Sequence, residues 1–223
     1  KRYFRGIVLK NEQPENIVDE MLSLWKKLDG HKLPVEKRKI LFVGEEISFA
    51  SRYRVEHFRE QLILRGYASR FIQMDQAEKE SLEEYEAIVL YRCSKLMEVE
   101  MLADRAKAAG IRVYYDIDDL VFDYEKIAGL HFLKGKEYSD FRTTAERTHG
   151  CMEFCDGYIT STETLAGVLR EEFSGKPVVI NRNCMSMEME ILSHEAFEQT
   201  DKNEEKIYIG YLSGSRTHDQ DFA

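Results

Sequence analysis

The residues best suited to chemistry are four carboxylates that follow one apolar run. Asp116, Asp118, Asp119 and Asp123 come directly after the segment 112–115. Three carboxylates this close stay ionised only when a cation or a basic side chain compensates them. A carboxylate near a hydroxyl group can orient it or remove its proton, and we expect this of Asp118 or Asp119. The alternative is structural, with Asp116 capping a loop and Asp119 beginning the next helix.

Three arginines are the candidate partners of such groups. Arg52 and Arg54 lie beyond the apolar run 39–44, and Arg92 follows the run 87–91. The forked donors of arginine can hold a sugar, a phosphate or a carboxylate. We expect these side chains to bind a ligand, and the alternative is that they form ordinary surface salt bridges.

The elements that position these residues can be read from the apolar pattern. Short apolar runs predict strands at 39–44, 68–74, 87–91, 112–117, 157–160 and 177–180, with amphipathic helices between several of them. This alternation predicts a doubly wound α/β fold with a parallel sheet. Thr160 and Glu163 have the spacing of a capping box and predict the start of a helix. In such sheets ligands bind outside the carboxyl ends of the strands, so the loops after the strands should share one rim.

The chain is expected to be a fragment with four parts. Residues 1–36 form an amphipathic helix and a connector, and residues 37–184 form the Rossmann-like domain. Residues 185–205 are polar, lack an apolar period and are interpreted as a linker. Residues 206–223 predict the first strand and turn of a second domain, in which the turn Ser213-Gly214-Ser215 could bind phosphate through its backbone amides.

Composition excludes several function classes. The net charge of −9 and a pI near 5.3 disfavour nucleic acid or an anionic membrane as the main partner. No apolar stretch has the roughly 18 residues of a membrane span, and no signal core is present. Four irregularly spaced cysteines do not indicate a disulfide framework, so we expect a cytoplasmic protein. The spacing of His149, Cys151 and Cys155 does not favour a metal site.

Five segments, in this order, resemble the family 4 (group 1) glycosyltransferases, which have the two-domain GT-B fold. They are LILRGY at 62–67, VYYDIDD at 113–119, CDGYITSTETL at 155–165, PVVINRN at 177–183 and IGYLSGSRTHD at 209–219. Their order and spacing carry the resemblance, which spans roughly residues 38 to 223. Two features depart from the family: the first loop has one glycine instead of a pair, and no histidine ends the strand that precedes Asp118.

The resemblance implies transfer of a sugar from a nucleotide-sugar donor to a saccharide or other hydroxyl acceptor, without an obligatory metal or cofactor. Such a hexosyltransferase would serve cell-surface polysaccharide or glycoconjugate synthesis. The candidate catalytic residues are Asp118 and Asp119, from their place at the end of a strand. The candidate acceptor contacts are Ser48, Arg52, Arg54, Arg92 and Asp116, and the candidate donor-phosphate contacts are Gly44, Ser213, Gly214, Ser215, Thr217 and His218. Because donor and acceptor enter from opposite domains, this fragment alone should be inactive.

Two alternatives remain open. The run from Val113 to Val121 also resembles the first motif of haloacid-dehalogenase-type phosphatases, in which Asp116 would be the nucleophile, Asp118 the acid and base, and magnesium the cofactor. In that family the motif normally opens the sheet, whereas here about three strands precede it. The second alternative is a non-catalytic glycosyltransferase-like domain that serves as a scaffold in a larger assembly.

Overall fold

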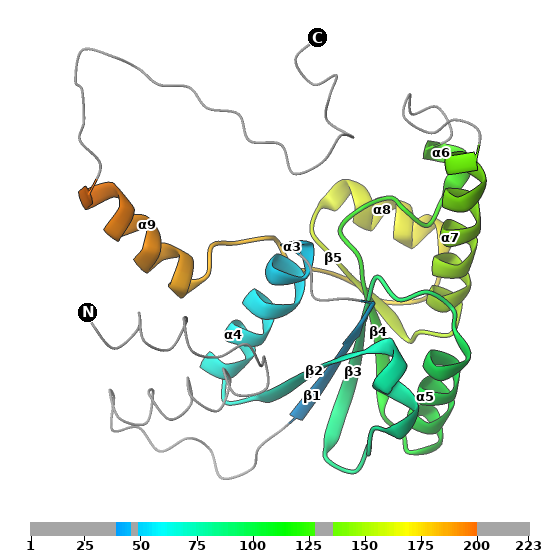
Figure 1. Cartoon of the computed structure of the whole chain (residues 1–223). Coiled ribbons are helices and arrows are strands. Elements are labelled where there is room, and N and C mark those ends of the chain that lie inside the picture. Colours follow the sequence, from blue (N-terminus) through cyan, green and yellow to red (C-terminus); the bar gives the residue numbers. More distant parts are fainter. Residues whose placement is uncertain (1–38, 46–48, 128–135, 200–223) are drawn as a thin grey trace.

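The protein contains a six-stranded, wholly parallel sheet (Figure 1). The structure, a computed structural model, describes residues 39–45, 49–127 and 136–199. The strands are β1 (Lys39–Gly44), β2 (Ala68–Gln73), β3 (Tyr85–Tyr91), β4 (Arg112–Asp116), β5 (Gly157–Thr160) and β6 (Val178–Ile180). Their order is β2-β1-β3-β4-β5-β6, and each pair is parallel. The prediction of a Rossmann-like α/β fold with a parallel sheet is confirmed.

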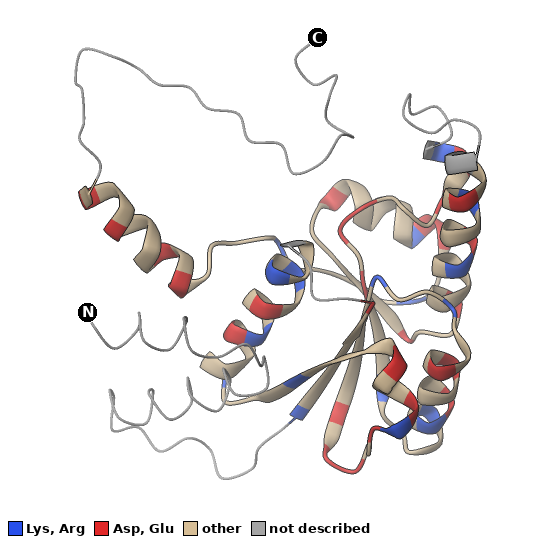
Figure 2. Cartoon of the chain, viewed as in Figure 1, with Lys and Arg blue, Asp and Glu red and all other residues tan. Residues whose placement is uncertain are grey.

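The strands form because their apolar side chains are covered on both faces of the sheet. Leu41 and Val43 pack into one core cluster and Phe42 into the other, so consecutive residues of β1 are all buried. Near-continuous apolar runs are typical of parallel strands that are buried on both sides. Charged residues lie mostly on helices and loops (Figure 2).

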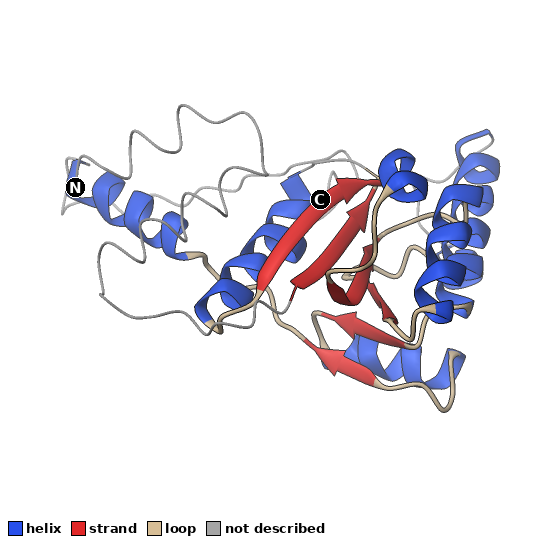
Figure 3. Ribbon diagram, turned by 90° about the horizontal axis from the view of Figure 1, so that it is seen from below, coloured by secondary structure: helices blue, strands red, loops and turns tan. Residues whose placement is uncertain are grey.

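Helices cover the two faces of the sheet (Figure 3). One face packs against a continuous helical segment, and its cluster includes Val55 and Leu62 of that segment. The other face packs against three α-helices, represented in its cluster by Val99, Met152 and Leu169, and against a 3-10 helix that contributes Met74 and Ala77. The first segment comprises α3 (Phe49–Ser51), the π-helix η1 (Arg52–Glu56) and α4 (His57–Leu64). The other helices are the 3-10 helix η2 (Met74–Lys79), α5 (Met97–Ala108), α6 (Tyr124–Ile127), α7 (Lys136–Glu153), α8 (Glu163–Glu172) and α9 (Met187–Gln199).

Two local predictions need correction. Thr162, and not Thr160, caps α8, because its side chain accepts a hydrogen bond from the backbone N–H of Leu165 at 3.2 Å. Thr160 is instead the fully buried last residue of β5. The segment 185–205, interpreted as a linker without an apolar period, contains helix α9, which the sequence pattern did not predict. None of the residues of α9 is buried. A helix that buries no face needs no regular spacing of apolar residues, so the sequence pattern did not mark it.

Some predictions fall outside the described residues. They concern the helix and connector at 1–36, Ser48, and the strand and turn at 206–223, with Ser213, Gly214, Ser215, Thr217 and His218. No described helix has both the length and the apolar character that crossing a membrane requires.

Candidate site at the carboxyl edge of the sheet

The carboxyl ends of the central strands bring the predicted residues to one edge. Gly44 pairs with Tyr91, and Tyr91 pairs in turn with Asp116, so β1, β3 and β4 end at the same level. The chain leaves β1 toward β2 on one side, while β3 lies on the other side. This reversal is the topological switch point, where open parallel sheets bind their ligands.

Arg92 begins the loop after β3 in an unusual backbone conformation. Its φ of 48° lies in the left-handed region, which costs energy for a residue with a side chain. Its backbone N–H donates to the carbonyl of Asp116 at 3.2 Å. This bond continues the β3–β4 pairing by one residue and holds Arg92 over the end of β4.

The Arg92 side chain bridges two of the predicted carboxylates. Its Nε and Nη2 donate to Oδ1 of Asp118 at 3.0 and 2.6 Å, and Nη2 also donates to Oδ2 of Asp119. Burial lowers the pKa of Arg92, but the negative charge of Asp118 above all outweighs this effect and raises the pKa above its ordinary value. Arg92 is therefore the cation that the sequence required for Asp118 and Asp119.

Only one of the two carboxylate oxygens of Asp118 accepts hydrogen bonds from Arg92. Both hydrogen bonds from Arg92 go to Oδ1, and no described residue makes a hydrogen bond to Oδ2. The side chain of Asp118 is 14% exposed and that of Asp119 is 58% exposed. Asp118 thus combines a fixed position with an oxygen that could accept a hydrogen bond from a ligand hydroxyl.

Asp116 is compensated by a different arginine. Arg54 Nε and Nη2 donate to Oδ1 and Oδ2 of Asp116, both at 2.8 Å, in a fork that joins η1 to the end of β4. The two side chains are 0% and 1% exposed. The prediction that Arg54 and Asp116 contact an acceptor is not supported here, because both are enclosed and bound to each other.

Burial and mutual attraction act in opposite directions on the pKa values of Arg54 and Asp116. Burial raises the pKa of Asp116 to about 6, and the positive charge of Arg54 opposes a larger rise. Burial also lowers the pKa of Arg54, but Asp116 outweighs this effect and the net pKa is raised. The fork of two hydrogen bonds, in which each carboxylate oxygen accepts from Arg54, is the geometry of a guanidinium paired with a carboxylate.

Tyr91 is a residue of this edge that sequence reasoning missed. Its side chain points to the same face as Arg54, and the Arg92 guanidinium carbon lies 5.6 Å from the centre of its ring. Burial raises the pKa of Tyr91, so the hydroxyl stays protonated. Among the described residues this buried hydroxyl has no hydrogen-bond partner. A tyrosine at the end of an apolar run looks like core in a sequence, so no signal distinguished it.

Two more predicted residues, Arg52 and Gly44, belong to the described part of the chain. Arg52 is exposed at the start of η1. Gly44 ends β1, and a Cβ added there would lie 3.0 Å from the Phe71 ring. Packing against Phe71 therefore explains the glycine, while its contact with donor phosphate stays a prediction.

The geometry disfavours the phosphatase interpretation. A phosphatase nucleophile must reach the phosphorus atom, yet both oxygens of Asp116 are bound to Arg54 and the side chain is enclosed. Within the described ranges, no group of three or more His, Cys, Asp or Glu residues could hold a metal ion.

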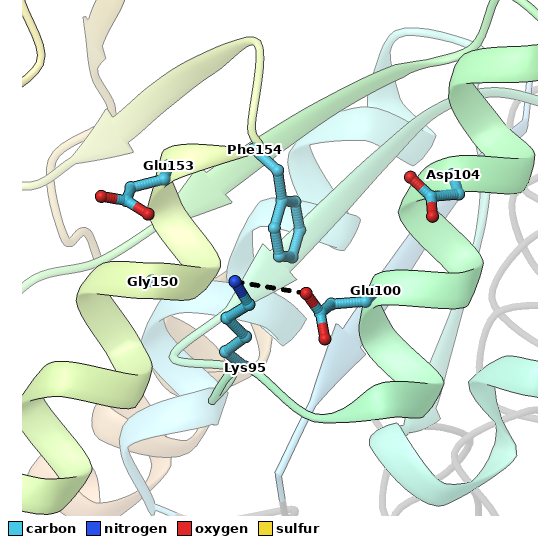
Figure 4. Close-up of a pocket in the computed structure, with 6 residues that line it drawn as sticks. All are labelled: Lys95, Glu100, Asp104, Gly150, Glu153 and Phe154. Atoms are coloured by element: carbon cyan, nitrogen blue, oxygen red, sulfur yellow. Dashed lines mark ion pairs between the residues drawn. The ribbon is translucent and has the colours of Figure 1, made fainter.

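A separate cavity of about 260 Å³ lies between α5 and the end of α7 (Figure 4). Its lining residues are Lys95, Glu100, Asp104, Gly150, Glu153 and Phe154. Lys95 Nζ and Glu100 Oε1 form an ion pair at 3.2 Å within it. Arg54, Arg92, Asp116, Asp118 and Asp119, which we call the carboxyl-edge cluster, do not line this cavity.

Comparisons with known proteins assign no family to the chain. No protein-family model matches it, and no curated protein matches its sequence.

Proposed function

We propose that the chain is the acceptor-side domain of a GT-B glycosyltransferase, which moves a sugar from a nucleotide-sugar donor to a hydroxyl acceptor. The observation that carries the proposal is the Arg92–Asp118 contact at the topological switch point, with Oδ2 of Asp118 left unbonded by the described residues. Hydroxyl groups are recognised by paired acceptors and donors of this kind, and the ordered segments that resemble the family supply the reaction class.

In this proposal Asp118 orients the acceptor hydroxyl and accepts its proton. The hydroxyl oxygen bonds to the anomeric carbon of the donor sugar, and the bond from that carbon to the diphosphate breaks, so that nucleoside diphosphate leaves. Arg92 holds the carboxylate in place through Oδ1, which leaves Oδ2 to face the hydroxyl. Asp119, bound to Nη2 of Arg92 and largely exposed, would contact a second hydroxyl of the acceptor. The donor phosphates would be held by the residues beyond 206.

The test is donor consumption by the protein expressed as its whole natural reading frame. Release of nucleoside diphosphate would be followed with UDP-, GDP-, ADP- and dTDP-sugars and a panel of saccharide acceptors. We expect release from at least one donor, and Asp118→Asn should lower kcat roughly 100-fold or more, the contribution typical of a general base. The donor KM should stay unchanged, because Asp118 contacts the acceptor only.

Asp104→Asn is the matched control, since Asp104 is an exposed carboxylate on α5 outside the cluster. This variant should keep the wild-type rate. Full turnover in Asp118→Asn would remove the catalytic assignment. If no donor is bound or consumed, the transferase proposal is wrong, and the scaffold alternative describes the chain better.

A further inference from the structure

The chain that leaves β6 is held by one polar face of the η1–α4 helix. We call residues 181–187 the strap. Its first residue, Asn181, still follows the sheet, because its N–H donates to the carbonyl of Thr160 at 2.8 Å. Arg54 then binds the strap twice, since Nη1 donates to the Asn181 carbonyl at 2.5 Å and to Oδ1 of Asn183 at 2.9 Å.

Further side chains on the same helix hold the rest of the strap. The Nδ1 atom of His57 lies 2.9 Å from the Cys184 carbonyl. Both carboxylate oxygens of Glu60 accept from the backbone N–H of Met187 at 3.1 Å. Gln61 Nε2 donates to the Cys184 sulfur at 3.0 Å. We call Arg54, His57, Glu60 and Gln61 the clasp; their spacing places them along one side of the helix.

Polar contacts hold the strap more than apolar burial does. The residues from Arg182 to Met185 are exposed, and within the strap only Ser186 is buried. The helix that follows, α9, has no buried residue. Segments with few buried apolar contacts open locally at a lower free energy than the sheet unfolds. The strap can therefore detach while the domain stays folded.

Arg54 connects the strap to the candidate site. The guanidinium that holds Asn181 and Asn183 is the one that forms the fork with Asp116. The carbonyl of Asp116 in turn accepts from the backbone of Arg92, which binds Asp118. Arg54 also sits inside a π-helix, a distortion that is frequent at functional positions. A continuous set of contacts thus runs from Asp118 to the strap.

We propose that the clasp is a releasable latch on the strap, and that Arg54 makes its release depend on the carboxylate of Asp116 at the carboxyl edge. The latch controls where the chain beyond Met187 is attached to the domain. A ligand that displaces Arg92 or Asp116 loosens the strap, and detachment of the strap loosens Asp116, because coupling between two sites is reciprocal. The proposal rests on the contacts alone and holds whether or not the domain serves a transferase.

Amide hydrogen exchange on the purified protein tests the latch. Asn183→Ala removes a clasp contact on an exposed residue, and Asp116→Asn removes the charge opposite Arg54 without touching the strap. In both variants we expect amides of residues 181–190 to exchange about tenfold faster, because the loss of roughly one hydrogen bond lowers the free energy of local opening. Peptides from β1 and β3 should keep their slow exchange in Asn183→Ala, whereas in Asp116→Asn they should also exchange faster, because that change breaks one side of a buried ion pair.

Val99→Ala is the control for general destabilisation, because Val99 is buried in α5 on the opposite face of the sheet. It should leave exchange in the strap unchanged. Equal loosening by Val99→Ala, or unchanged strap exchange in Asp116→Asn, would overturn the coupling. If Asp116→Asn does not fold, Asp116→Glu decides the same point, since glutamate keeps the charge and displaces the fork without removing a strap contact. Unchanged exchange in both Asn183→Ala and Glu60→Gln would overturn the latch itself.

Discussion

Replacing Arg54 with methionine should destabilise the domain by about 3 to 5 kcal/mol, the cost typical of breaking one side of a buried ion pair. Methionine is apolar and of comparable length, so the cavity contribution stays small. The substitution leaves the Asp116 carboxylate 1% exposed and without the two 2.8 Å hydrogen bonds that compensate it. Because a domain's whole stability is about 5 to 15 kcal/mol, this one change removes a large share of it.

The assay is urea unfolding followed by far-ultraviolet circular dichroism, applied to Arg54→Met, Asp116→Leu and the double variant. Removing both charges eliminates the uncompensated carboxylate, so the double variant should recover about 2 kcal/mol or more relative to Arg54→Met. Arg112→Met is the matched control on the same strand as Asp116. Its ion pair with Asp156 is 69% and 38% exposed, and its loss should cost less than about 1 kcal/mol.

The reasoning is refuted if Arg54→Met costs no more than the Arg112 control. It is also refuted if the double variant is as unstable as the less stable single variant, because the cost would then come from lost packing and not from an uncompensated charge. The slope of the unfolding free energy against urea concentration should be the same in all variants. A different slope would show that the folded or the unfolded state had changed in compactness, and the variants would then be compared by their calorimetric Tm values.

Three further predictions concern single side chains. Burial raises the pKa of Asp116 from 3.8 to about 6 in the folded chain, so its contribution to stability should fall by about 2 kcal/mol as the pH rises from 4.5 to 7.5. Urea unfolding of wild type against Asp116→Asn at pH 4.5 and 7.5 measures this term, and a constant difference between the two proteins would contradict it. Thr162→Val should cost about 1 kcal/mol by removing the α8 cap. Thr160→Val should be neutral or stabilising, because among the described residues the buried Thr160 hydroxyl has no hydrogen-bond partner. Calorimetric Tm values compare the two variants, and a lower Tm for Thr160→Val than for Thr162→Val would show that Thr160 is the cap. Cys184 is exposed while the other three cysteines are buried with raised pKa values, so native protein should react with one equivalent of a disulfide reagent and denatured protein with four; a native count of zero or above one would contradict the burial pattern.

The sheet could be predicted from the sequence because its signal is local. A strand buried on two faces needs an apolar run, and each predicted run matches a strand to within about two residues, as 87–91 does with β3 at Tyr85–Tyr91. The parallel order followed from the alternation of strands and helices. The same reasoning placed Arg92, Asp116 and Asp118 at one edge, since parallel strands end together. The need for a cation beside these carboxylates was also predicted.

Which cation serves which carboxylate was decided only in three dimensions. Arg54 and Asp116 are 62 residues apart, and their sequence neighbourhoods contain nothing that distinguishes a buried fork from an exposed ligand-binding arginine. Helix α9 escaped prediction because it buries no residue, so no apolar period marks it. The two candidate caps of α8 differ only in which threonine ends the strand, and pairing with β6 places Thr160 inside it.

The amino-acid sequence by itself determined the layered fold and the edge at which polar side chains collect, because apolar periodicity and strand direction are properties of neighbouring residues. Only the tertiary structure divided those side chains into two groups. Arg54 and Asp116 are enclosed and connect the edge to the strap, whereas Arg92, Asp118 and Asp119 stay accessible. The division depends on the solvent access and partner geometry of residues that meet only when the helices pack on the sheet.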